Sequence, residues 1–150
     1  IDKLTLAALE ATLIHYLTPE AARDRLRVLK ALTEPLADVK KRAQRLLRLL
    51  RRAGLDGLDA ALAHGTSMTG GGSLPTQEIP TALVALKPRA MSAGRLEERL
   101  RGLETPVVAR IAEDTVVLDA RTLAEDELIP IRDGLRTLFA SRPGDPGANP

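Results

Sequence analysis

Residues 65–80 read GTSMTGGGSLPTQEIP and divide an apolar segment at 58–64 from another at 81–86. Glycine loses more backbone entropy on ordering than any other residue, so the run of three glycines is a poor interior for a helix or a strand. We therefore predict that residues 65–80 form a loop between two strands. The N–H groups of such a loop can face an anion at close range. The loop is either one wall of a binding site or a tight structural connection.

Three helices are predicted before this loop, because apolar residues recur there at spacings of three and four. The first covers residues 3–17. The sequence TPE at 18–20 starts the second helix, which is expected to run to residue 32, and TEP at 33–35 starts the third. Gly54 ends the third helix.

After the loop, the pattern predicts a strand at 81–86 and then a short helix, which Ser92 caps and Gly102 ends. Strands at 107–111 and 115–119 are expected to form a hairpin. A final helix is predicted over 125–140. The tail at 141–150 is rich in Pro and Gly and is expected to be disordered.

These elements together predict an α+β fold, in which N-terminal helices precede a small, mostly antiparallel sheet with helices on one face. We expect residues 1–57 to form a helical segment and residues 58–140 to form a compact α+β domain.

The composition excludes several classes of function. The chain of 150 residues has no cysteine, so it has no disulfide, no thiolate nucleophile and no cysteine-based zinc site. One Tyr, one Phe and no Trp leave little aromatic surface for stacking on single-stranded nucleic acid. Two histidines are too few for a histidine-based metal site. No apolar run approaches the roughly 20 residues of a membrane span, so we expect no membrane contact and a cytoplasmic protein.

Charge is distributed unevenly along the chain. Residues 1–57 carry 12 Lys and Arg against 7 Asp and Glu, whereas residues 58–150 carry 10 against 13. The outer face of the predicted third helix is expected to carry Lys40, Lys41, Arg42, Arg45, Arg48, Arg51 and Arg52. Four of these, Lys41, Arg45, Arg48 and Arg52, align as one stripe. Such a stripe either contacts RNA phosphates or is the solvated face of an Arg-rich helix.

The common catalytic motifs are missing, since neither GxxxxGK[ST], GxGxxG, HExxH nor GxSxG occurs. Ser67 and Ser73 flank the glycines, and His64 is close enough in sequence to Ser67 for a Ser–His pair to be conceivable. The simpler interpretation of His64 is a hydrogen-bonded polar group. None of the lysines has the neighbours of an activated amine. The residues alone therefore predict no self-contained active site.

Six blocks of the sequence match a known family in order and spacing. They are DKLTLAALEATL at 2–13, LTEPL at 32–36, GTS at 65–67, GGGSLP at 70–75, PVVARI at 106–111 and LDARTL at 118–123. In these blocks the chain resembles bacterial selenocysteine synthase, the L-seryl-tRNA(Sec) selenium transferase family. Its members are pyridoxal-phosphate (PLP) enzymes with the aspartate-aminotransferase fold. The likeness covers about residues 1–140.

The resemblance implies that this chain is the C-terminal part of a longer enzyme, similar to the small C-terminal domain of fold-type-I PLP enzymes. In the family a lysine of the preceding domain binds PLP, so no residue here is expected to be catalytic or to hold the cofactor. The family's enzyme eliminates the seryl hydroxyl and adds selenium from selenophosphate, which yields selenocysteinyl-tRNA(Sec). The implied partners of the full-length protein are tRNA(Sec), selenophosphate and further copies of itself, and this chain alone is expected to be inactive.

The resemblance also implies that the glycine loop faces a cleft shared with the preceding domain, and that it is poorly ordered without that domain. Arg110 and Arg121 would present a guanidinium to a phosphate or carboxylate, or would pair with Glu113, Asp114 or Asp119. Candidate cleft residues are Ser67, Gly70, Gly71, Gly72, Ser73, Arg110 and Arg121. Candidates for tRNA contact are Lys41, Arg45, Arg48 and Arg52.

Two other functions remain open at this point. One is a related PLP enzyme that acts on a small amino acid or amino sugar without tRNA. The other is a non-enzymatic module whose basic helix binds nucleic acid or an acidic partner.

Overall fold

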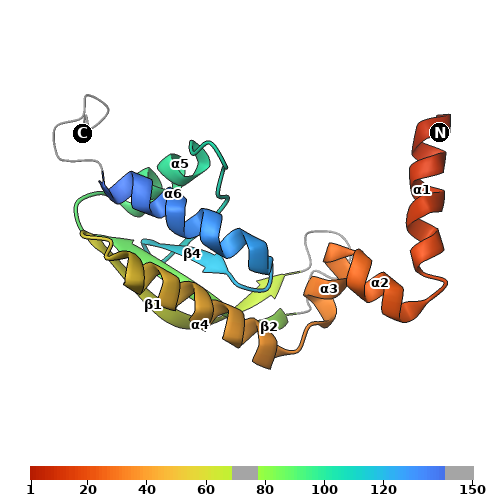
Figure 1. Cartoon of the computed structure of the whole chain (residues 1–150), viewed down its shortest axis with the longest axis horizontal. Helices are drawn as coiled ribbons and strands as arrows, with labels where there is room; N and C mark the ends of the chain where they lie inside the picture. The colour runs from red at the N-terminus through yellow and green to blue at the C-terminus, as the bar shows by residue number, and fades with distance from the viewer. Residues whose placement is uncertain (69–77, 141–150) are drawn as a thin grey trace. The chain divides into compact units, whose positions relative to one another are not determined.

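The computed structural model describes residues 1–68 and 78–140 (Figure 1). Most of the glycine loop, which was predicted to be poorly ordered, lies outside these ranges. The tail at 141–150, which was predicted to be disordered, lies wholly outside them. The chain divides into two compact units, Ile1–Pro35 and Leu36–Pro150.

The first unit contains three helices, α1 (Lys3–His15), α2 (Pro19–Arg25) and α3 (Arg27–Thr33). Asp2 caps α1 by accepting a hydrogen bond from the Thr5 N–H at 2.9 Å. The prediction of one continuous helix over 19–32 is wrong, because Leu26 has an extended conformation that ends α2 and begins α3. Neither Gly nor Pro marks this break, so the local sequence gives no signal for it.

The helix α1 exposes its apolar residues. Leu9 is 48% exposed and Leu17, which follows the helix, is 81% exposed. Within α1, all of whose residues are described, no side chain is buried. The apolar residues that predicted α1 are therefore uncovered in this unit.

The second unit is an α+β domain, as predicted. Its sheet has the strand order β1-β2-β4-β3, and every neighbouring pair is antiparallel. In chain order the elements are α4 (Leu36–Ala53), β1 (Leu58–Met68), β2 (Glu78–Pro88), α5 (Ala93–Arg101), β3 (Arg110–Ala112), β4 (Thr115–Asp119), the short 3-10 helix η1 (Glu125–Glu127) and α6 (Leu128–Ala140).

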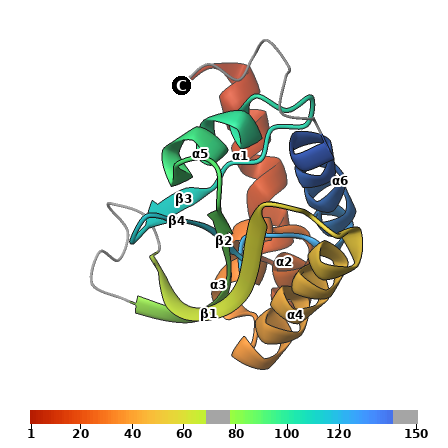
Figure 2. The same ribbon diagram turned by 90° about the vertical axis from the view of Figure 1, so that its left-hand side faces the viewer.

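The helices of this unit cover one face of the sheet, which we call the helix face (Figures 1 and 2). The helix α4 packs against β1 and β2, α5 packs against β3 and β4, and α6 contacts α4 and α5. Aliphatic side chains fill the core, and burial of each stabilises the fold by roughly 1.5–3 kcal/mol. The fully buried ones include Val39, Leu46, Val84, Leu86, Leu96, Leu100, Val116, Leu128 and Leu135.

This packing places α4 in the same compact unit as the sheet, and not in a helical segment of residues 1–57 as predicted. Its apolar stripe explains the placement, since Val39, Leu46 and Leu50 all face the sheet core.

Several element boundaries also differ from the predictions. The strand predicted over 107–111 begins only at Arg110, because the Val107 N–H instead donates to the Leu100 carbonyl at the end of α5. The closing helix begins with the 3-10 turn η1. Pro130 lies in the first turn of α6, where its missing N–H costs little.

The hairpin of β1 and β2 is longer than predicted. Its pairing runs from Leu58 and Pro88 to Met68 and Glu78, whereas β2 pairs with β4 only as far as Leu83. Residues 65–68 and 78–81 thus form a two-stranded extension, which we call the arm. At its start, Gly65 lies so close to Leu83 that a Cβ atom on Gly65 would be 2.6 Å from the Leu83 Cδ1.

The turn between β3 and β4 gives a testable prediction. Glu113 and Asp114 both have positive φ, 48° and 55°, which is the type I′ geometry that Asn-Gly adopts with least strain. Replacing the pair by E113N/D114G should raise the free energy of unfolding by about 1 kcal/mol, because left-handed backbone costs ordinary residues roughly that much. Urea denaturation measures the change. E113Q removes a charge without easing the backbone, and an equal gain from that control would contradict the explanation.

Candidate functional site

Polar residues gather on the face of the sheet that points away from the helices. Successive side chains of a strand point to opposite faces, so Ser67, Thr81 and Asp119 lie on the face opposite the core residues Val84 and Leu118. Two arginines join them from β3 and from the residues after β4. We call this set, Ser67, Thr81, Arg110, Asp119 and Arg121, the Asp119 cluster.

The carboxylate of Asp119 is the centre of this cluster. Its Oδ2 accepts a hydrogen bond from the Ser67 hydroxyl at 2.5 Å, and its Oδ1 accepts from the Thr81 hydroxyl at 2.6 Å. The Arg121 backbone N–H also donates to Oδ1, at 3.0 Å. The Asp119 side chain is only 12% exposed, so these charge-assisted bonds are poorly screened by solvent.

The two arginines of the cluster have different surroundings. Arg121 is buried, 6% exposed, and its Nη2 donates to the Pro80 carbonyl at 2.6 Å. The Arg110 side chain is 47% exposed, with its Nη2 at 3.2 Å from the Thr66 carbonyl and 4.0 Å from Asp119 Oδ2. Of the two, Arg110 alone presents a guanidinium that is accessible to an anion from outside the chain.

Of the acidic partners considered for these arginines, Asp119 is the one in contact. It is within ion-pair distance of Arg110, whereas Glu113 and Asp114 form the turn beyond β3. Thr81 was not among the predicted site residues, and Asp119 appeared only as an ion-pair partner. Their meeting depends on the pairing of β2 with β4, which brings Leu83 opposite Asp119.

The Ser67–His64 pair is wrong. Both residues belong to β1, and residues three apart on a strand point to opposite faces. The Ser67 hydroxyl instead donates to Asp119 and is 8% exposed. The cluster therefore offers Ser67 as part of a structural hydrogen-bond set rather than as a nucleophile with a base.

The other loop candidates, Gly70, Gly71, Gly72 and Ser73, lie outside the described residues. The described ends of that segment are Met68 on β1 and Glu78 on β2, both on the arm.

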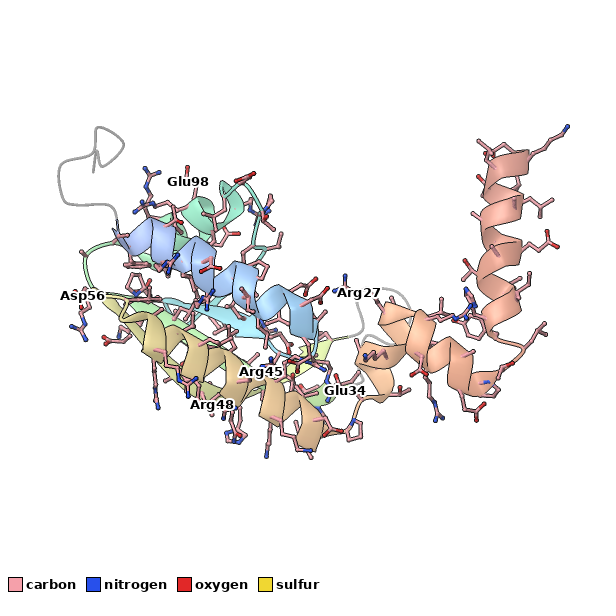
Figure 3. The ribbon with its side chains drawn as sticks, in the orientation of Figure 1. Arg27, Glu34, Arg45, Arg48, Asp56 and Glu98 are labelled. Atoms are coloured by element: carbon pink, nitrogen blue, oxygen red, sulfur yellow. The ribbon has the colours of Figure 1, made fainter. Side chains whose placement is uncertain are left out.

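The basic stripe of α4 lies on the face opposite its buried residues, and Figure 3 labels two of its members, Arg45 and Arg48. Lys41 pairs with Asp38 and Arg45 pairs with Glu125, each at 2.8 Å. Arg48 and Arg52 are exposed and form no ion pair with the residues that the structure describes. They are the two stripe members whose guanidinium groups are available to another molecule.

Arg42 was predicted to share the outer face, and this is wrong. It is 7% exposed, and its Nη1 donates to the Ala120 carbonyl at 2.9 Å. Arg42 flanks the buried residues of α4, and its guanidinium is itself buried, with Nε 3.5 Å from the Glu125 carboxylate. Its role is to join α4 to the chain that follows β4.

The described residues do not fit a covalent PLP site. The hydrogen bond to Asp38 holds the pKa of Lys41 above its usual 10.5, which is opposite to the shift of an activated amine. Lys3 and Lys30 are exposed on α1 and α3, Lys40 is partly exposed on α4, and Lys87 is exposed near the end of β2. Among residues 1–68 and 78–140, no three His, Asp or Glu side chains gather as a metal site. The same residues contain no helix with the length and apolar character needed to span a membrane.

Comparison with known proteins identifies the family. The structure defines an α+β domain with helices on one face and a polar cluster on the other. The chain belongs to the L-seryl-tRNA selenium transferase family, whose family model matches residues 1–124. This match confirms the resemblance seen in the sequence.

Curated relatives carry the same description. A protein of Nitratidesulfovibrio vulgaris called L-seryl-tRNA(Sec) selenium transferase is 43% identical over 136 residues, which are 91% of this chain and 29% of the relative. Proteins with the same name from Geotalea uraniireducens and Solidesulfovibrio magneticus are 43% and 45% identical over 92% and 85% of this chain. The chain spans under a third of the length of these relatives.

An ion pair at the end of β1 that is remote from the Asp119 cluster gives a prediction about how stability depends on pH. Asp59 accepts hydrogen bonds from Arg89, which hold the pKa of Asp59 below its usual 3.8. Because the pKa is lowered in the folded state, the pair stabilises the fold above pH 3.8, and this contribution is lost as the pH falls through the folded-state pKa. D59N should therefore lower the urea midpoint at neutral pH, and the difference from the parent chain should close in acid.

The control for this measurement is E104Q, which removes an exposed carboxylate that has no ion pair among the described residues. Its urea midpoint should follow that of the parent chain across the acid range. A D59N difference that stayed constant well below pH 3.8 would show that the effect is not ionic.

Proposed function

We propose that this chain is the C-terminal part of a cytoplasmic enzyme that converts seryl-tRNA(Sec) to selenocysteinyl-tRNA(Sec) with selenophosphate. The observation that carries the proposal is the match to the L-seryl-tRNA selenium transferase family over residues 1–124. Relatives with that name, at 43% identity over 91% of the chain for one of them, support it. On this proposal the full-length protein works as an oligomer with PLP as its cofactor.

The cofactor would be held by parts of the full-length protein outside this chain, since none of its lysines has the setting of an activated amine. PLP, when bound, supplies an electron sink that lets the seryl hydroxyl leave. The share of this chain in the reaction is to form one side of the substrate cleft. Arg110, half-exposed beside the arm, is the residue best placed to meet an anionic group of the substrate.

The exposed apolar surface of α1 fits the same proposal. A helix that is apolar on all sides is normally buried in a larger protein. An open hollow of about 390 Å³ beside α1 is lined by Leu6, Leu9, Leu13, Ile14 and Leu17 together with one charged residue, Glu10. We infer that this surface packs against the preceding domain of the full-length protein, so that residues 1–35 link that domain to the sheet.

The direct test is to incubate the full-length protein, loaded with PLP, with seryl-tRNA(Sec) and selenophosphate. Formation of selenocysteinyl-tRNA(Sec) is expected, and the 150-residue chain alone should form none. Turnover of free serine or an amino sugar with no turnover of seryl-tRNA(Sec) would instead favour a related PLP enzyme that does not use tRNA.

The basic stripe gives a separate prediction about tRNA. If Arg48 and Arg52 contact phosphates, R48Q/R52Q in the full-length protein should weaken tRNA(Sec) binding and reduce the slope of log K against log salt by about 1 to 2. Fluorescence titration at several salt concentrations measures both quantities.

The matched control is R95Q/R101Q, which removes the same charge from the exposed face of α5, where both arginines form ion pairs with glutamates of the same helix. This control should leave the slope unchanged. An equal loss in the two double variants would assign the effect to net charge, and no loss in R48Q/R52Q would make the stripe a solvated face.

A further inference from the structure

The arm is the part of the sheet with the least support. It consists of residues 65–68 and 78–81, beyond the last pair between β2 and β4, Leu83 with Asp119. An isolated two-stranded hairpin is marginally stable in water, because it buries little surface and one edge of each strand is unpaired. The position of the arm must therefore depend on contacts besides its own ladder.

Four such hydrogen bonds come from three residues of one stretch of chain, which consists of β3, β4 and the two residues after β4. The Asp119 carboxylate accepts from the hydroxyls of Ser67 on β1 and Thr81 on β2, at 2.5 and 2.6 Å. Arg121 donates to the Pro80 carbonyl at 2.6 Å. Arg110 donates to the Thr66 carbonyl at 3.2 Å. Both strands of the arm are thus tied to the same neighbouring hairpin.

The burial of these groups indicates a built contact rather than a chance surface pair. Thr81 is 2% exposed, Arg121 is 6% exposed and Ser67 is 8% exposed. The Asp119 carboxylate is 12% exposed. A carboxylate so largely shielded from solvent that bridges two strands fixes both its distance and its direction to each, whereas an exposed ion pair fixes neither.

We propose that Asp119 is a positioning residue, which together with Arg110 and Arg121 clamps the arm and so fixes where Met68 and Glu78 lie. The link to catalysis rests on the proposed function, because Arg110 reaches the substrate cleft only if this face of the sheet borders it. The clamp itself rests on the contacts of the Asp119 cluster alone.

The test uses the full-length protein and two readouts. In D119A, hydrogen exchange of the backbone amides of the arm (residues 65–68, 78, 79 and 81) should become at least tenfold faster, while the core strands keep their protection. The kcat/KM for seryl-tRNA(Sec) should fall about 10- to 100-fold, because a displacement of about 1 Å of the Arg110 guanidinium or of the arm beside it would misplace the substrate. D119N keeps one oxygen acceptor and should restore part of both losses.

D59A is the matched control, since it removes a carboxylate that bonds to an arginine at the other end of β1. It should change neither readout. If D119A does not fold, S67A/T81V removes the two hydroxyl donors instead and should loosen the arm in the same way.

Unchanged exchange of the arm in the folded variants would overturn the clamp. Faster exchange with unchanged kcat/KM would overturn its role in the reaction. An inactive wild-type enzyme with a loosened arm in D119A would refute the proposed function and leave the clamp standing, so the two failures are distinguishable.

Discussion

Among the described residues of the second unit, the helices lie on one face of the four-stranded sheet, and this asymmetry governs the rest of that unit. On the helix face, Val84, Leu86 and Leu118 join the leucines of α4, α5 and α6 in one aliphatic core. On the other face, alternate residues of β1, β2 and β4 contribute Ser67, Thr81 and Asp119 to the Asp119 cluster. Hydrophobic burial is non-directional and holds the layers together, whereas the hydrogen bonds of Asp119 are directional and fix one end of the sheet. The helix face therefore supplies most of the stability of this unit, and the opposite face fixes the positions of particular side chains.

The sequence predicted those parts of the fold that depend on local pattern. The α+β class, the stripe of α4, the Ser92 cap of α5 and the hairpin of β3 and β4 all follow from periodicity or local capping and turn signals. The break at Leu26 has no such signal. The late start of β3 depends on a hydrogen bond from Val107 to the end of α5, which the spacing of apolar residues does not encode.

The candidate site was harder to predict than the fold, for a physical reason. Ser67, Thr81 and Asp119 are far apart in sequence and meet only through the register of β1, β2 and β4. Short motifs could indicate Ser67 and Arg110 as candidate site residues. They could not indicate that both side chains lie next to the carboxylate of Asp119. Arg42 shows the converse limit, because its position at the border of the helical stripe was compatible with either face until its bond to Ala120 was known.

The strand order places β1 at the edge of the sheet, with β2 as its strand partner within the described residues. From Ala60 to Met68 this strand contains no Lys, Glu, Asp, Arg or Pro, which are the residues that usually protect an edge from pairing with another chain. Its outer row of N–H and C=O groups is therefore a template on which a further extended segment can be added. The residues of this edge therefore place no chemical barrier against a wider sheet.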